Sequence, residues 1–131
     1  MDSARILIVD DDPDITEAMK VVLESNGYRV DSATDSEQAM ELVKSTKPDL
    51  IIMDVIMNTL REGFLLSRQL KDNPRYKHIP ILMISAAKEK IGIDFKPAAG
   101  DEQWLPVEDF LDKPVMPDVL LEKVSSLLQE S

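Results

Sequence analysis

Cysteine and long apolar runs are both missing from this chain of 131 residues. Without cysteine, disulfide bonds and thiolate metal sites are excluded. The first apolar run, Ile6 to Val9, is far shorter than the apolar core of a signal peptide. No run approaches the roughly 18 residues that a membrane-spanning helix requires. We therefore expect no membrane insertion, and a reducing cytoplasm is the expected compartment.

Positive charge is also in short supply. The chain has 15 lysines and arginines but 25 aspartates and glutamates, which gives a net charge of −10. Proteins that bind nucleic acid need a basic surface for its phosphates, so direct contact with nucleic acid is not expected. The length fits one domain, and residues 1–131 are predicted to form a single folded unit.

Apolar runs and helical periodicity alternate along the chain. The segment Pro13 to Asn26 carries apolar residues at helical spacing, with Asp12 placed to cap its start and Gly27 to end it. Further helices are expected from about residue 36, over 61–71, and from about 116 to the end of the chain. The expected strands lie at about 5–10, from 28 onward, and at 50–53, 79–84 and 110–112.

The run Leu50 to Met53 is apolar at every position, which is typical of a parallel strand covered on both faces. With the alternation of strands and helices, it predicts an α/β fold: a doubly wound, five-stranded parallel sheet of order 2-1-3-4-5, as in flavodoxin-like proteins. The segment Ala86 to Glu108 fits this pattern less well. Gly92, Pro97 and Gly100 interrupt it, so the fourth crossover is predicted to be poorly helical.

Charged side chains follow three of the apolar runs. Asp10, Asp11 and Asp12 come after the first run, Asp54 ends the third, and Lys113 follows the last. In open α/β sheets, ligands bind at the edge formed by the carboxyl ends of the strands. These residues, far apart in the sequence, are therefore expected to converge at one edge.

The chemistry of these residues favours magnesium and phosphate. Asp11, Asp12 and Asp54 would bring several negative charges into one cleft, which requires a cation. Mg²⁺ prefers oxygen ligands and leaves room for water and phosphate oxygens. The Asp54 carboxylate can then attack phosphorus and form an acyl phosphate. The Lys113 ammonium and the Ser85 hydroxyl, at the end of the fourth strand, can each meet a phosphoryl oxygen.

These residues carry a resemblance to the receiver domains of bacterial two-component response regulators, in particular the stand-alone, chemotaxis-regulator-like ones. The matching motifs span nearly the whole chain. They are Ile8 to Asp12, Asp54 with Met57, Ser85-Ala86, and Phe110 to Pro114.

The resemblance implies a role for each matching position. Asp11 and Asp12 would hold Mg²⁺, together with Asp54 and the backbone carbonyl of Ile56. Asp54 would be phosphorylated, and Lys113 would contact the phosphoryl group. The switch residues would be the Ser85 hydroxyl and the Phe110 ring, which changes rotamer with phosphorylation.

The same resemblance implies a signalling switch, which is not an enzyme beyond its own phosphorylation and dephosphorylation. It would accept a phosphoryl group from a sensor histidine kinase or a histidine phosphotransfer protein. It would then signal through its surface to a downstream protein that the sequence does not identify.

Three other interpretations stay open. A flavodoxin-like carrier of flavin mononucleotide shares the strand order but needs a hydroxyl-rich phosphate loop, where this chain has acids from Asp10 to Asp14. A phosphatase-type hydrolase usually carries a second carboxylate two residues after the nucleophile, and Ile56 stands there. A pseudo-receiver would bind partners without phosphorylation.

Overall fold

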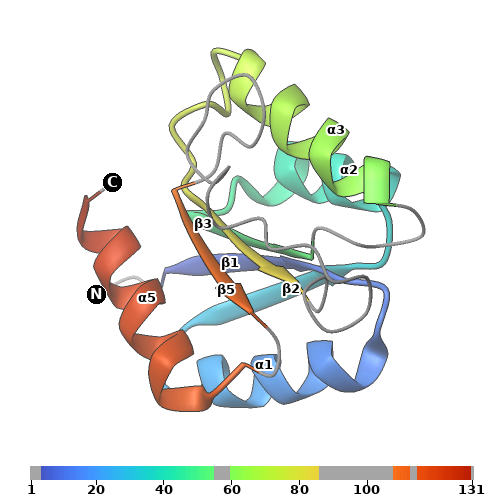
Figure 1. Ribbon diagram of the computed structural model, residues 1–131. Helices are drawn as coiled ribbons and strands as arrows, with labels where there is room; N and C mark the ends of the chain where they lie inside the picture. The colour runs from blue at the N-terminus through green and yellow to red at the C-terminus, as the bar shows by residue number, and fades with distance from the viewer. Residues whose placement is uncertain (1–3, 55–59, 86–107, 113–114, 131) are drawn as a thin grey trace.

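The computed structural model describes residues 4–54, 60–85, 108–112 and 115–130. Its centre is a five-stranded sheet in which every neighbouring pair is parallel, in the order β2-β1-β3-β4-β5 (Figure 1). The strands are β1 (Arg5–Val9), β2 (Arg29–Ala33), β3 (Leu50–Asp54), β4 (Ile81–Ser85) and β5 (Asp109–Asp112). The predicted sheet and its strand order are confirmed.

The helices begin and end close to the predicted positions. They are α1 (Pro13–Ser25), α2 (Ser36–Thr46), α3 (Leu60–Asp72) and α5 (Pro117–Glu130). Asp12 caps α1 through a carboxylate that accepts two backbone N–H groups of the first turn, and Asp35 caps α2 by accepting one, from Gln38. In the described part of the chain, none of these helices is long and apolar enough to cross a membrane.

Two apolar layers cover the sheet, because successive side chains of a strand point to opposite faces. On one face, Leu7 of β1 and Ile51 of β3 pack in the same buried cluster as residues of α2 and α3. On the other face, Ile8 and Ile52 pack with residues of α1 and α5. Figure 1 shows α2 and α3 on one side of the sheet and α1 and α5 on the other. This double cover explains why the runs Ile6 to Val9 and Leu50 to Met53 are apolar at every position.

One strand boundary differs from the prediction. β4 begins at Ile81, whereas the sequence suggested Ile79. The Ile79 N–H donates to the Tyr76 carbonyl (3.0 Å), so this residue still belongs to the preceding turn. Pro80 has no N–H to donate, although its carbonyl accepts from Ile51 N–H (3.0 Å). The first regular ladder position of β4 is therefore Ile81.

The predicted poorly helical crossover lies almost wholly outside the described residues, since only its last residue, Glu108, is described. Glu108 joins β4 to the start of β5. Its N–H donates to the Ile81 carbonyl (3.0 Å), and its carboxylate accepts from Ile81 N–H (2.6 Å).

Candidate functional site: a carboxylate cluster at the sheet edge

The register of β1 and β3 places two aspartates side by side at the carboxyl edge of the sheet. Val9 pairs with Met53 in the parallel register, so one further residue along each chain brings Asp10 beside Asp54. Both follow the alternation of their strands onto the face covered by α1 and α5. Both are buried, with 1% of Asp10 and 3% of Asp54 exposed.

Asp11 completes the cluster. One carboxylate oxygen from each of Asp10, Asp11 and Asp54 lies within 4.8 Å of the other two. Asp11 is exposed, so the cluster opens to solvent on its side. The structure thus confirms that carboxylates from the ends of two separate strands converge.

A divalent cation suits this arrangement on physical grounds. Two unit negative charges 4.8 Å apart repel each other by about 3–4 kcal/mol at an effective dielectric constant of about 20. Asp10 and Asp54 are both buried, so water screens their repulsion poorly. Mg²⁺ favours carboxylate oxygens combined with coordination positions left for water or phosphate. Two buried carboxylates beside an exposed one fit that preference.

Asp12 lies outside this cluster, contrary to the metal-binding role that the sequence suggested for it. Its Oδ1 accepts the N–H groups of Asp14 (3.0 Å) and Ile15 (3.3 Å), as an N-cap does. Helix α1 starts at the next residue, so the carboxylate is directed toward the helix end. The Asp12 N–H in turn donates to Asp10 Oδ1 (2.9 Å), which fixes the turn between the strand and the helix.

The sequence suggested Asp12 and not Asp10 as a metal ligand, whereas the structure places Asp10 in the cluster. The signal that identifies Asp10 is strand parity. Asp10 continues the alternation of Ile6 and Ile8, and Asp54 continues that of Leu50 and Ile52. The register pairs Ile8 with Ile52, so the next alternate positions, Asp10 and Asp54, come onto the same face.

The structure describes two of the other predicted site residues, Ser85 and Phe110. Ser85 is the last residue of β4 and pairs with Asp112, while the preceding Ile84 pairs with Asp54. Phe110 is buried in the cluster that faces α2 and α3, and it pairs with Met83. The carboxyl ends of β1, β3, β4 and β5 therefore lie in sequence along one edge. Lys113 and Ile56 lie outside the described residues.

The fold agrees with comparisons to known proteins. The family model of the response regulator receiver domain matches residues 6–125. The chain belongs to this family: it is a receiver domain of the response regulators of two-component signalling.

A curated relative is the response regulator MprA of Mycobacterium ulcerans, which is 35% identical over 133 residues. That match covers 98% of this chain and 52% of the relative. The chain spans about half the length of the first curated relatives that it matches.

Solved structures with the same fold include two that match over nearly their full length. A Chloroflexus aurantiacus chain described as a response regulator has a TM-score of 0.85 and 31% identity, covering 98% of this chain and 99% of that one. The chemotaxis response regulator CheY4 of Vibrio cholerae has a TM-score of 0.77 and 29% identity, covering 96% and 99%.

Proposed function

We propose that this receiver domain accepts a phosphoryl group on Asp54 in a reaction that depends on Mg²⁺. The observation that carries the proposal is the convergence of the Asp10, Asp11 and Asp54 carboxylates at the sheet edge. Receiver domains typically bind Mg²⁺ at such an aspartate cluster, and the donor set here is composed of oxygen ligands alone. We assign the metal to Asp10, Asp11 and Asp54, with the backbone carbonyl of Ile56 as a fourth ligand.

Asp54 is the proposed nucleophile because it ends the central strand β3, which pairs with β1 on one side and β4 on the other. A buried, fixed carboxylate loses little freedom when it attacks phosphorus in line. The bond between phosphorus and the donor nitrogen breaks as the bond to the Asp54 carboxylate oxygen forms. The electron pair of the broken bond stays on the donor imidazole.

Bound Mg²⁺ supplies charge neutralisation at the phosphoryl oxygens. Lys113 has a matching role in the proposal, since it follows β5 and its ammonium can meet another phosphoryl oxygen. The carboxylates of Asp10 and Asp11 would hold the cation beside Asp54. The cation would in turn orient the incoming phosphoryl group. Asp12 contributes indirectly, by fixing the turn in which Asp10 and Asp11 lie.

The proposed switch runs from Ser85 to Phe110. Ser85 ends the strand next to Asp54, and its hydroxyl would be drawn toward a phosphoryl group on that residue. Phe110, on the neighbouring strand, occupies a buried position among residues that contact α2 and α3. A switch needs two discrete arrangements, each favoured by one phosphorylation state. The buried Phe110 ring is the arrangement that we assign to the unphosphorylated form.

The proposed phosphoryl donor is a sensor histidine kinase or a histidine phosphotransfer protein, because receiver domains interact with such proteins. The recipient of the signal is a further protein, since the net charge of −10 is unfavourable for direct contact with nucleic acid.

Incubation with acetyl phosphate and Mg²⁺ tests this proposal directly. We expect the intact mass to rise by roughly 80 Da, the mass of one phosphoryl group that a carboxylate nucleophile would take up. Excess chelator should prevent the rise, because the buried carboxylates then repel the phosphoryl oxygens. A protein that gains no mass under any of these conditions would instead be a pseudo-receiver that binds partners without phosphorylation.

A further inference from the structure

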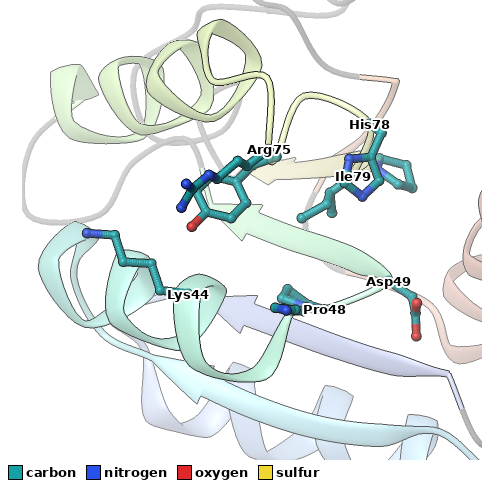
Figure 2. A pocket seen from close by; sticks show the side chains of 9 residues that line it. Lys44, Pro48, Asp49, Arg75, His78 and Ile79 are labelled. Carbon is teal, nitrogen blue, oxygen red and sulfur yellow. The ribbon is translucent and has the colours of Figure 1, made fainter.

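A groove of about 990 Å³ lies at the amino edge of the sheet, opposite the carboxylate cluster (Figure 2). One wall comes from the end of α2 and the connection to β3. The other comes from the connection between α3 and β4, residues 75–80. We call this the basic groove, because three exposed cations line it, Lys44, Lys47 and Arg75, against a single carboxylate, Asp49.

The charge of the basic groove is opposite to that of the whole chain. Lys44, Lys47 and Arg75 form no salt bridge with any residue in the described ranges, whereas Arg5, Lys71 and Lys123 are paired with carboxylates. Figure 2 shows the charged ends of Lys44 and Arg75 at one end of the groove and the Asp49 carboxylate at the other. The Asp49 carboxylate also accepts the Arg5 N–H (2.8 Å), which occupies one of its oxygens. The end formed by Lys44 and Arg75 is therefore suited to an anion.

The remaining lining is apolar or aromatic. Pro48, Ile79 and Pro80 are buried beneath the groove, and the half-buried Tyr76 packs against the core cluster that faces α2 and α3. A fixed aromatic side chain beside apolar surface suits a flat ring system. The volume also lies within the range usual for small-molecule sites, about 300–1,000 Å³.

Both walls of the basic groove are held in place by hydrogen bonds. Lys71 Nζ donates to the carbonyls of Lys77 (3.2 Å) and Ile79 (2.9 Å), and it is also paired with Glu108. On the other side, Asp49 N–H donates to the Arg5 carbonyl (2.7 Å) at the edge of the sheet. A ligand would therefore meet a site that is already formed, which lowers the entropic cost of binding.

Lys47 occupies a backbone position that favours glycine. It ends α2 with a φ of 51°, in the left-handed region, and it is the non-glycine residue with positive φ in the described ranges. Helices commonly end in glycine at such a position, because a side chain there is strained. A strained residue at a groove is reason to suspect a function for its side chain. A lysine near a helix C-terminus also stabilises the helix dipole, so a test must separate the two roles.

We propose that the basic groove binds a nucleoside phosphate, with its phosphates at Lys44, Lys47 and Arg75 and its base against Tyr76 and the apolar floor. Arginine and lysine are the usual partners of phosphate oxygens. The groove and the carboxylate cluster lie at opposite ends of β3, so this inference does not depend on phosphorylation of Asp54.

Titration of the full chain with ADP, followed in ¹H–¹⁵N correlation spectra, tests the proposal. Excess EDTA keeps the carboxylate cluster free of metal, so phosphates are repelled there. We expect ADP to shift amide resonances of residues 44–47, 49 and 75–79. We also expect ADP to bind more tightly than inorganic pyrophosphate or adenosine, because each of these engages only part of the groove.

Three variants sharpen the test. Arg75→Ala should weaken ADP binding about ten-fold, as expected when one charge-assisted contact is lost. Arg68→Ala removes an arginine of α3 that is also exposed but lies outside the groove, and it should leave binding unchanged. Lys47→Gly relieves the left-handed strain, so its unfolding temperature should not fall although its affinity for ADP does.

Three results would overturn the proposal. The first is the absence of shifts in these segments at millimolar ADP. The second is an Arg68→Ala variant that loses as much affinity as Arg75→Ala, which would show unspecific charge attraction. The third is tighter binding by a glutamate-rich peptide than by ADP, which would make the groove a protein docking surface.

Discussion

Replacement of Asp54 by asparagine is expected to abolish phosphorylation by acetyl phosphate completely. Asparagine has nearly the same shape, so the buried position at the end of β3 stays filled. The amide, however, is not a usable nucleophile toward phosphorus. Intact mass measurement after incubation with acetyl phosphate and Mg²⁺ should show no gain in the variant.

The matched control for this variant is Asp35→Asn. It removes the same charge, and asparagine caps a helix as well as aspartate does, so α2 should be unaffected. Its mass gain should equal that of the parent chain. If Asp54→Asn still gains one phosphoryl group, the nucleophile lies elsewhere and the assignment of the site is wrong.

The second large effect is on the affinity for Mg²⁺, which should depend on Asp10 and not on Asp12. Asp10→Asn should weaken Mg²⁺ binding by at least roughly ten-fold, since even the loss of an outer partner of a metal ligand typically costs 10–100-fold. Asp12→Asn should leave Mg²⁺ binding nearly unchanged, because its oxygen caps α1 and lies outside the cluster. Isothermal titration calorimetry with MgCl₂ measures both affinities.

Stability without metal gives an independent check on the same pair of residues. In EDTA, Asp10→Asn should raise the free energy of unfolding, because it removes one of two buried like charges and keeps the oxygen that accepts from Asp12 N–H. Asp12→Ala should lower it by about 1 kcal/mol, the usual cost of a lost N-cap. Equal losses of Mg²⁺ affinity in Asp10→Asn and Asp12→Asn would contradict the assignment.

The sheet and its strand order could be predicted because the relevant signals are local. The runs in β1 and β3 are apolar at every position, and only a sheet covered on both faces buries such runs completely. The start of α1 could also be predicted from the sequence, because Asp12 followed by Pro13 is a common helix beginning.

The membership of the metal cluster was predicted only in part. Asp11 and Asp54 lie in it as expected, whereas Asp10 takes the place that the sequence suggested for Asp12. Residue type alone does not show which of three consecutive aspartates binds the metal. They differ in the geometry of the turn, which turns one carboxylate toward the cluster and another toward the helix end.

The basic groove could not be predicted from the sequence. Its cations come from two segments, the end of α2 with its connection to β3 and the connection between α3 and β4, and β3 and α3 separate these segments in the sequence. His78, on the same connection as Arg75, also lines this groove. The parallel sheet brings the two connections together, because the starts of β3 and β4 are neighbours.

Chemical mapping of the phosphoryl group tests the central claim most directly. An acyl phosphate is reduced by borohydride to an alcohol, so phosphorylated chain that is reduced and digested should carry the change at one aspartate. The account predicts that this residue is Asp54, at the end of β3 and beside Asp10. Reduction at Asp10 or Asp11, or a change spread over several aspartates, would contradict it.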